Sequence, residues 1–171
     1  PGFMATAACE SKITYIDGDN GVLLYRGYPI EQLATKSSFL EVAYLLINGE
    51  LPTATQLEQF DHSIRYHTRI NESLLRFFNG FHYNAHPMAM VSAVVSSMAA
   101  FYHDSMDNNN PRHREIFAHR ILAKIPTVSA AAFKHMLGQP FVYPRNDLDY
   151  CANMLNMFFA VPAEDYVVDP M

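Results

Sequence analysis

Basic and aromatic residues at helical spacing are the first candidates for chemistry in this chain. Four of them recur at intervals of three and four residues, which places them along one side of a helix: His113, Phe117, Arg120 and Lys124. Tyr102 precedes this segment. Two fixed cations beside a tyrosine can bind a phosphorylated or carboxylated ligand. The spacing alone favours the alternative that Arg120 and Lys124 lie on a solvated surface near the C-terminus of a helix, where the helix dipole favours positive charge.

The histidines and cysteines show no pattern of a metal site or a nucleophile. His82 and His86 are four residues apart, but no third ligand follows at metal-site spacing. Cys9 has no neighbouring base, and Cys151 lies on an apolar helical stripe, so we expect both thiols to be buried and inert. Phosphate-binding glycine loops and hydrolase nucleophile motifs are missing from the sequence. We assign no metal site and no resident cofactor.

The composition narrows the class of protein. The chain has 171 residues, of which 50% are hydrophobic and 17% charged, and its net charge is −5. This length and hydrophobic content are enough for a folded core. The negative net charge makes the chain a poor binder of nucleic acid. No apolar run is long enough to span a membrane, and the two cysteines form no disulfide framework. We expect a cytoplasmic protein with no nucleic-acid or membrane partner.

The hydrophobic pattern predicts a mainly α fold with a small β-hairpin at its front. Residues 13–16 and 22–25 are β-rich and are joined by a short loop that contains glycine and asparagine. From residue 29 the period becomes helical, and capping boxes at Ser38 and Thr53 predict two helix starts. The remaining helices are expected over five ranges: 74–81, 87–102, 111–124, 127–137 and 147–160.

Four of these helices carry more detailed expectations. Apolar residues surround the helix over 87–102, which predicts burial on all sides. Pro126 should break or kink the chain and so separate the helices at 111–124 and 127–137. The helix over 147–160 has an amphipathic stripe that should face the core. Its members are Leu148, Cys151, Ala152, Leu155, Phe158 and Phe159.

Several runs in the sequence resemble bacterial citrate synthase. The hairpin region matches at 11–18 and 24–30, and the match continues in order through four further runs: 86–89, 101–104, 110–115 and 138–146. The last two runs resemble the Gram-negative, hexameric type of the family. The resemblance covers the whole chain and implies that residues 1–171 are part of the large helical domain, without the small domain and the catalytic segments.

Members of this family condense acetyl-CoA with oxaloacetate to give citrate and CoA. The resemblance implies that the catalytic aspartate and histidines, and the arginines that bind oxaloacetate, belong to segments that nothing here matches. We therefore assign no catalytic residue and expect an inactive piece of a longer enzyme. A close relative, 2-methylcitrate synthase, is an alternative parent, although the runs at 110–115 and 138–146 favour the citrate enzyme.

The resemblance also implies a separate site for the inhibitor NADH. Six residues match family positions that line it: His67, Thr68, Tyr102, Arg120, Lys124 and Asn146. Three residues depart from NADH-sensitive relatives: Tyr66 replaces Arg, Arg69 replaces Met and Ala163 replaces a reactive Cys. We expect Arg69 to restore the charge lost at position 66, and we expect no sensitivity to thiol reagents from position 163.

The family resemblance further implies an oligomer. The helices at 87–103 and 111–137 should pack against a twofold copy to form a dimer, and the parent enzyme should be a hexamer. An alternative function for the chain itself is that of an NADH-binding regulatory and assembly module, with Arg120 and Lys124 holding phosphates.

Overall fold

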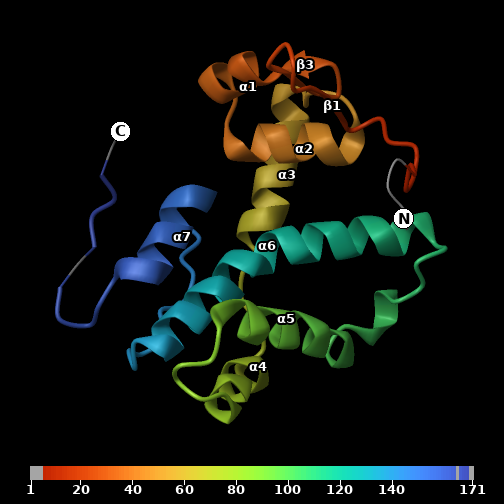
Figure 1. Ribbon diagram of the computed structural model, residues 1–171. Helices are drawn as coiled ribbons and strands as arrows, with labels where there is room; N and C mark the ends of the chain where they lie inside the picture. Colours follow the sequence, from red (N-terminus) through yellow and green to blue (C-terminus); the bar gives the residue numbers. More distant parts are fainter. Residues whose placement is uncertain (1–5, 165, 170–171) are drawn as a thin grey trace. The chain divides into compact units, whose positions relative to one another are not determined.

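The computed structural model describes residues 6–164 and 166–169 of the chain (Figure 1). Contacts divide the chain into two compact units, Pro1–Phe60 and Asp61–Met171. Among the described residues, seven α-helices and one three-stranded antiparallel sheet account for the regular structure, apart from three short 3₁₀ turns. The predicted mainly α class is therefore confirmed. None of the helices in this described part is long and apolar enough to span a membrane.

The first unit contains the predicted hairpin. Strand β1 (Thr14–Asp17) pairs with β2 (Val22–Tyr25) in antiparallel register, with Tyr15 opposite Leu24. Gly21 has a φ of +67°, the left-handed conformation that a tight connection requires and glycine adopts without strain. A third short strand, β3 (Tyr28–Pro29), extends the sheet beside β2 and was not predicted.

Both capping boxes are present. Helix α1 (Ile30–Lys36) is followed by α2 (Phe39–Asn48), and the Ser38 hydroxyl accepts the Glu41 N–H while the Glu41 carboxylate accepts the Ser38 N–H at 2.6 Å. The same reciprocal pair joins Thr53 and Gln56 at the start of α3 (Ala54–Arg65). These side chains satisfy the N–H groups that the first helical turn leaves unpaired.

The second unit is built around one long helix. Helices α4 (Glu72–Phe77) and α5 (Pro87–Ser97) come first, then α6 (Pro111–Met136) and α7 (Tyr150–Phe159). Helix α6 packs against both α5 and α7. The core is formed by apolar residues from α4, α5, α6 and their connections: Ile70, Leu74, Leu75, Phe78, Met90, Val94, Met98, Val128, Ala131 and Ala132.

Helix α6 corrects the prediction of two separate helices. It continues through Pro126, and Figure 1 shows the ribbon changing direction about halfway along it, so the proline kinks the helix without breaking it. A proline cannot donate to the carbonyl four residues earlier, which here belongs to Leu122. The Tyr150 hydroxyl of α7 donates to this carbonyl at 2.9 Å. Tertiary structure therefore satisfies the acceptor that the proline leaves without a helical donor.

Helix α5 is less buried than predicted. Met90, Val94 and Met98 are almost fully buried and form one stripe, whereas Met88 on another side is 63% exposed. Val91 and Val95 are partly buried against the core, but Met88 is left uncovered in the described chain, so the expectation of burial on all sides is wrong for this chain.

Helix α7 is also oriented differently from the prediction. Its buried residues are Asn153, Asn156 and Met157, whereas Leu155 and Phe159 of the predicted stripe are exposed. Asn153 is buried because its amide oxygen accepts the Arg145 backbone N–H at 2.9 Å, a contact that hydrophobic periodicity does not register.

The prediction that both cysteines are buried is wrong. Cys9 and Cys151 are free thiols on the surface of the described chain. Partial desolvation, followed by the nearby Asp149 carboxylate, raises the pKa of the Cys151 thiol, which favours the protonated form that is a poor nucleophile.

Candidate functional site

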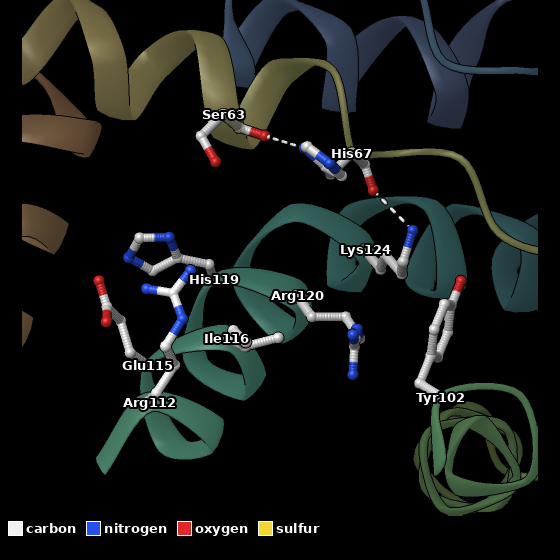
Figure 2. A pocket seen from close by; sticks show the side chains of 9 residues that line it. All are labelled: Ser63, His67, Tyr102, Arg112, Glu115, Ile116, His119, Arg120 and Lys124. Atoms are coloured by element: carbon white, nitrogen blue, oxygen red, sulfur yellow. Dashed lines mark hydrogen bonds between the residues drawn. The ribbon is translucent and has the colours of Figure 1, made fainter. Parts of the chain in front are cut away.

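A pocket of about 360 Å³ lies in the second unit. The end of α3 and the segment after it, the connection between the 3₁₀ turns that follow α5, and the first half of α6 supply its walls (Figure 2). It is lined by Ser63, His67, Tyr102, Arg112, Glu115, Ile116, His119, Arg120 and Lys124.

Four of the six residues proposed from the sequence line this pocket: His67, Tyr102, Arg120 and Lys124. Thr68 is buried beside it, and its backbone oxygen accepts the Thr127 hydroxyl at 2.8 Å. Asn146 is exposed on the connection before α7 and is not among the lining residues. The Arg69 side chain does not line the pocket either.

The predicted stripe was only partly right, because Arg120 and Lys124 line the pocket whereas its other two members do not. Neither His113 nor Phe117 lines the pocket: the His113 ring accepts the Asp107 N–H, and Phe117 is 51% exposed. Apart from Glu115 and His119, the α6 residues that line the pocket form a row at a spacing of four, which was the signal available in the sequence. Its members are Arg112, Ile116, Arg120 and Lys124.

Lys124 is buried, so its interpretation as a solvated surface cation near a helix C-terminus is wrong. It lies in mid-helix, and its ammonium donates to the backbone oxygens of His67, at 2.7 Å, and Arg69. Burial, and then the charge of Arg120, lowers the pKa of Lys124 to about 8. Lys124 thus fixes residues 67–69 against α6 and brings a cation to the pocket wall.

Arg120 forms the polar end of the pocket together with Tyr102. Its guanidinium lies 4.3 Å from the centre of the Tyr102 ring, donates to the Ser105 hydroxyl at 2.7 Å, and lies 3.9 Å from the exposed Asp104 carboxylate. The Lys124 ammonium lies 5.4 Å from the same ring. Burial raises the pKa of the Tyr102 phenol, although Arg120 opposes the shift. Tyr102 therefore stays neutral and presents its ring to both cations.

The other end of the pocket combines a cation, a carboxylate and an imidazole. Figure 2 shows Arg112, Glu115 and His119 together, away from Tyr102. Burial lowers the pKa of His119; the Glu115 carboxylate opposes this shift, and His67 adds to it. His67 Nδ1 lies 2.6 Å from the Ser63 backbone oxygen, so this nitrogen carries the proton. Because burial lowers its pKa, His119 is largely neutral near pH 7.

The lining charges make this pocket suited to an anion. Arg112, Arg120 and Lys124 supply three cations against the single carboxylate of Glu115. Guanidinium groups form charge-assisted hydrogen bonds with phosphates and carboxylates, and a neutral aromatic ring can pack against a planar group. Within residues 6–164 and 166–169, no group of three His, Cys, Asp or Glu side chains could hold a metal ion.

The fold defines a class of mainly helical proteins with a small antiparallel sheet near the N-terminus of the chain, and comparison with known families identifies this class. Residues 2–170 match the family model described as citrate synthase, C-terminal domain. The chain belongs to the citrate synthase family.

Solved structures agree with this assignment. The chain is similar to citrate synthase from Pyrobaculum aerophilum, with 31% identity and a TM-score of 0.83 over 92% of this chain and 41% of that one. It is similar to the Thermotoga maritima enzyme, with 32% identity and a TM-score of 0.77 over 92% of this chain and 40% of that one.

A third structure supports the fold alone. Citrate synthase from Thermoplasma acidophilum, solved with carboxymethyl coenzyme A and oxaloacetate, is 22% identical, with a TM-score of 0.82 over 90% of this chain and 40% of that one. The chain spans about two fifths of the length of all three solved relatives.

Proposed function

We propose that this chain is part of a citrate synthase that condenses acetyl-CoA with oxaloacetate to give citrate and CoA. The family match over residues 2–170 supports this proposal, as do two solved citrate synthases at 31% and 32% identity. We further propose that residues 1–171 form part of the large helical domain of a cytoplasmic enzyme of the Gram-negative, hexameric type. The sequence runs at 110–115 and 138–146 support this narrower assignment.

Turnover of acetyl-CoA tests the proposed activity. The 171-residue chain alone should release no CoA above background when oxaloacetate is added, because no segment matches the family's catalytic runs. A longer protein that contains this chain should release CoA, measured with a thiol-reactive dye. Oxaloacetate-dependent turnover by the chain alone would contradict this proposal. Faster turnover of propionyl-CoA than of acetyl-CoA by the longer protein would indicate a 2-methylcitrate synthase.

We also propose that the pocket on α6 is a regulatory site for NADH. The observation that supports this function is the placement of Arg120 and Lys124 around the neutral ring of Tyr102, with Arg112 on the same wall. Cations of this kind suit the phosphates of a nucleotide, and the ring suits a planar base. All lining residues lie in the second unit, so the chain can form this pocket without any other segment.

Titration with NADH tests the regulatory site. The double variant Arg112→Ala/Arg120→Ala should bind NADH at least about tenfold more weakly than the wild type, since each charge-assisted hydrogen bond contributes roughly 1.5–3 kcal/mol. Arg76→Ala, at an exposed arginine outside the pocket, is the matched control and should bind normally. Equal affinity in all three proteins, or binding in none, would reject the NADH site.

A further inference from the structure

Asparagine is followed by glycine at three places in this chain: 20–21, 48–49 and 79–80. In such a pair the backbone nitrogen of the glycine can attack the side-chain carbonyl of the asparagine. A C–N bond forms and closes a succinimide ring, and the side-chain nitrogen leaves as ammonia with the proton of the glycine N–H. Water then opens the ring at either carbonyl and gives aspartate or isoaspartate. Glycine favours the attack because it has no Cβ to crowd its nitrogen.

The three pairs lie in different backbone settings. Asn20 and Gly21 belong to the exposed turn between β1 and β2, outside both strands. Asn48 is the last residue of α2, and Asn79 lies in a 3₁₀ turn after α4. The attack requires the asparagine backbone to rotate until the glycine nitrogen faces the side-chain carbonyl. Helical structure holds this torsion in the α region, so the segments of Asn48 and Asn79 must first open locally.

The attacking nitrogens also differ in their hydrogen bonds. The Gly49 N–H donates to the Leu45 backbone oxygen at 2.8 Å, and the Asn48 side-chain amide donates to the Tyr44 oxygen at 3.1 Å. Both reacting groups of this pair are therefore held by α2. Among the described residues, the Gly21 N–H has no hydrogen-bond acceptor. The nitrogen that would attack Asn20 is thus free to do so.

Asp17 positions the Asn20 side chain over the turn. Its carboxylate accepts the side-chain amide of Asn20 at 2.8 Å and the Asn20 backbone N–H at 3.1 Å. These bonds, the side-chain bond first, lower the pKa of Asp17, so this carboxylate is ionised at neutral pH. The amide nitrogen that donates to Asp17 is the leaving group. Deamidation would replace this donor with a second carboxylate, which repels Asp17.

We propose that Asn20 is a site of spontaneous deamidation in the folded chain, and that its conversion weakens the turn between β1 and β2. This turn joins Asp17 and Val22, which pair across the two strands. Conversion to isoaspartate adds a carbon to the main chain between these paired residues. It also removes the hydrogen bond from the Asn20 side chain to Asp17.

Peptide mapping after incubation at mildly alkaline pH tests the site. Mass spectrometry measures the conversion of each asparagine to an acid, and isoaspartyl methyltransferase with a labelled methyl donor detects isoaspartate. In the folded chain Asn20 should convert at least about tenfold faster than Asn48 and Asn79, because the helical pairs must open first. In urea the three rates should agree within about threefold, since the unfolded chain protects none of them.

Asn20→Gln is the matched variant, because its longer amide closes a larger ring more slowly. It should lose the isoaspartate signal from the tryptic peptide 13–26 and keep the slow conversion of Asn48 and Asn79. If Asn48 or Asn79 converts as fast as Asn20 in the folded chain, the site is rejected. The site is also rejected if Asn20 converts at least about tenfold more slowly in the folded chain than in urea.

Hydrogen exchange tests the effect on the turn. Ion exchange separates the converted chain, because deamidation adds a negative charge. The backbone amides of β1 and β2 should exchange faster in this fraction than in the unconverted chain, because the turn that joins the strands is weaker. Equal exchange in the two fractions would reject the weakening of the turn.

Discussion

Lys124 is a buried cation whose partners are two backbone carbonyls rather than a carboxylate. Removing an ammonium from water is costly, and hydrogen bonds donated by the ammonium to backbone oxygens offset only part of this cost. The pKa of Lys124 is lowered to about 8 because the rest of this desolvation cost is not offset. At the scale of the residue, Lys124 therefore supports the segment 67–69 at the expense of some electrostatic energy.

Lys124→Met tests this structural role. The substitution preserves the length of the side chain but leaves the oxygens of His67 and Arg69 without their donor, which should lower the free energy of unfolding by about 2 kcal/mol. Urea denaturation measures this difference. Lys12→Met, at an exposed lysine, is the control and should change stability little. Equal stability of the two variants would contradict the role.

Lys124 also predicts a pH dependence. Its pKa is about 8 in the folded chain and about 10.4 in the unfolded chain, so between these values the unfolded state binds more protons. The contribution of this residue to the free energy of unfolding therefore rises with pH across that window and is constant below it. The difference in unfolding free energy between the wild type and Lys124→Met should increase from pH 8 to pH 10. A flat difference would mean that the pKa is not depressed.

Among the elements, α6 and α7 depend on each other through the carbonyl that Pro126 leaves without a donor. A buried acceptor without a donor costs about 1–3 kcal/mol. The kink in α6 and the position of α7 are consequently coupled, because the Tyr150 hydroxyl must reach Leu122.

A double-mutant cycle measures this coupling. Tyr150→Phe should destabilise the wild-type chain by about 1–2 kcal/mol, because it removes the hydroxyl that donates to the Leu122 carbonyl. In a Pro126→Ala background, the restored backbone N–H can donate to the same carbonyl, so Tyr150→Phe should cost less. Chemical denaturation of the four proteins gives the coupling energy. Equal costs in both backgrounds would show that the hydroxyl does not replace the missing helical bond.

At the scale of the whole molecule, we propose that α5 and α6 meet a second copy of this chain. Met88 is 63% exposed and Phe117 is 51% exposed, and these large apolar side chains have no cover in the described chain. Exposed apolar surface of this kind is typical of protein–protein interfaces. The hexamer expected of the parent enzyme belongs to the same proposal.

Phe117→Glu tests the association. A charge at the centre of an apolar interface should shift the chain towards a monomer, because desolvating an unpaired carboxylate is costly. Sedimentation velocity should show a smaller species for the variant at the concentration at which the wild type dimerises. Val167→Glu, at an exposed valine outside both helices, should leave association unchanged. A monomeric wild type would contradict the proposed dimer.

The sequence was sufficient to predict those parts of the fold that depend on local contacts. The capping boxes at Ser38 and Thr53 and the hairpin pairing could be predicted because each depends on residues a few positions apart. The exposed sides of α5 and α7 could not, because an apolar pattern shows that a surface needs cover without showing which element supplies it. The burial of Asn153 depends on a backbone group in the preceding loop, and Pro126 is tolerated because of Tyr150, which is 24 residues away.

The candidate site was partly predictable for the same reason. Arg120 and Lys124 stood out as cations, but their sequence positions gave no indication that Lys124 is buried against residues 67–69. Arg112 and Glu115 resemble ordinary charges near the start of a helix. Only the placement of Ser63, His67 and Tyr102 around α6 shows that they line a pocket.

The hydrogen bond from Tyr150 to Leu122 can be followed through the absorbance of the Tyr150 phenol. The chain has no tryptophan, so its ten tyrosines dominate its near-ultraviolet absorbance. Burial, then Cys151, raises the pKa of Tyr150 to about 12, whereas unperturbed phenols ionise near 10. In an alkaline spectrophotometric titration, the phenolate signal of Tyr150 should emerge after that of the exposed tyrosines, and its early appearance would mark the moment at which α7 leaves the kinked helix.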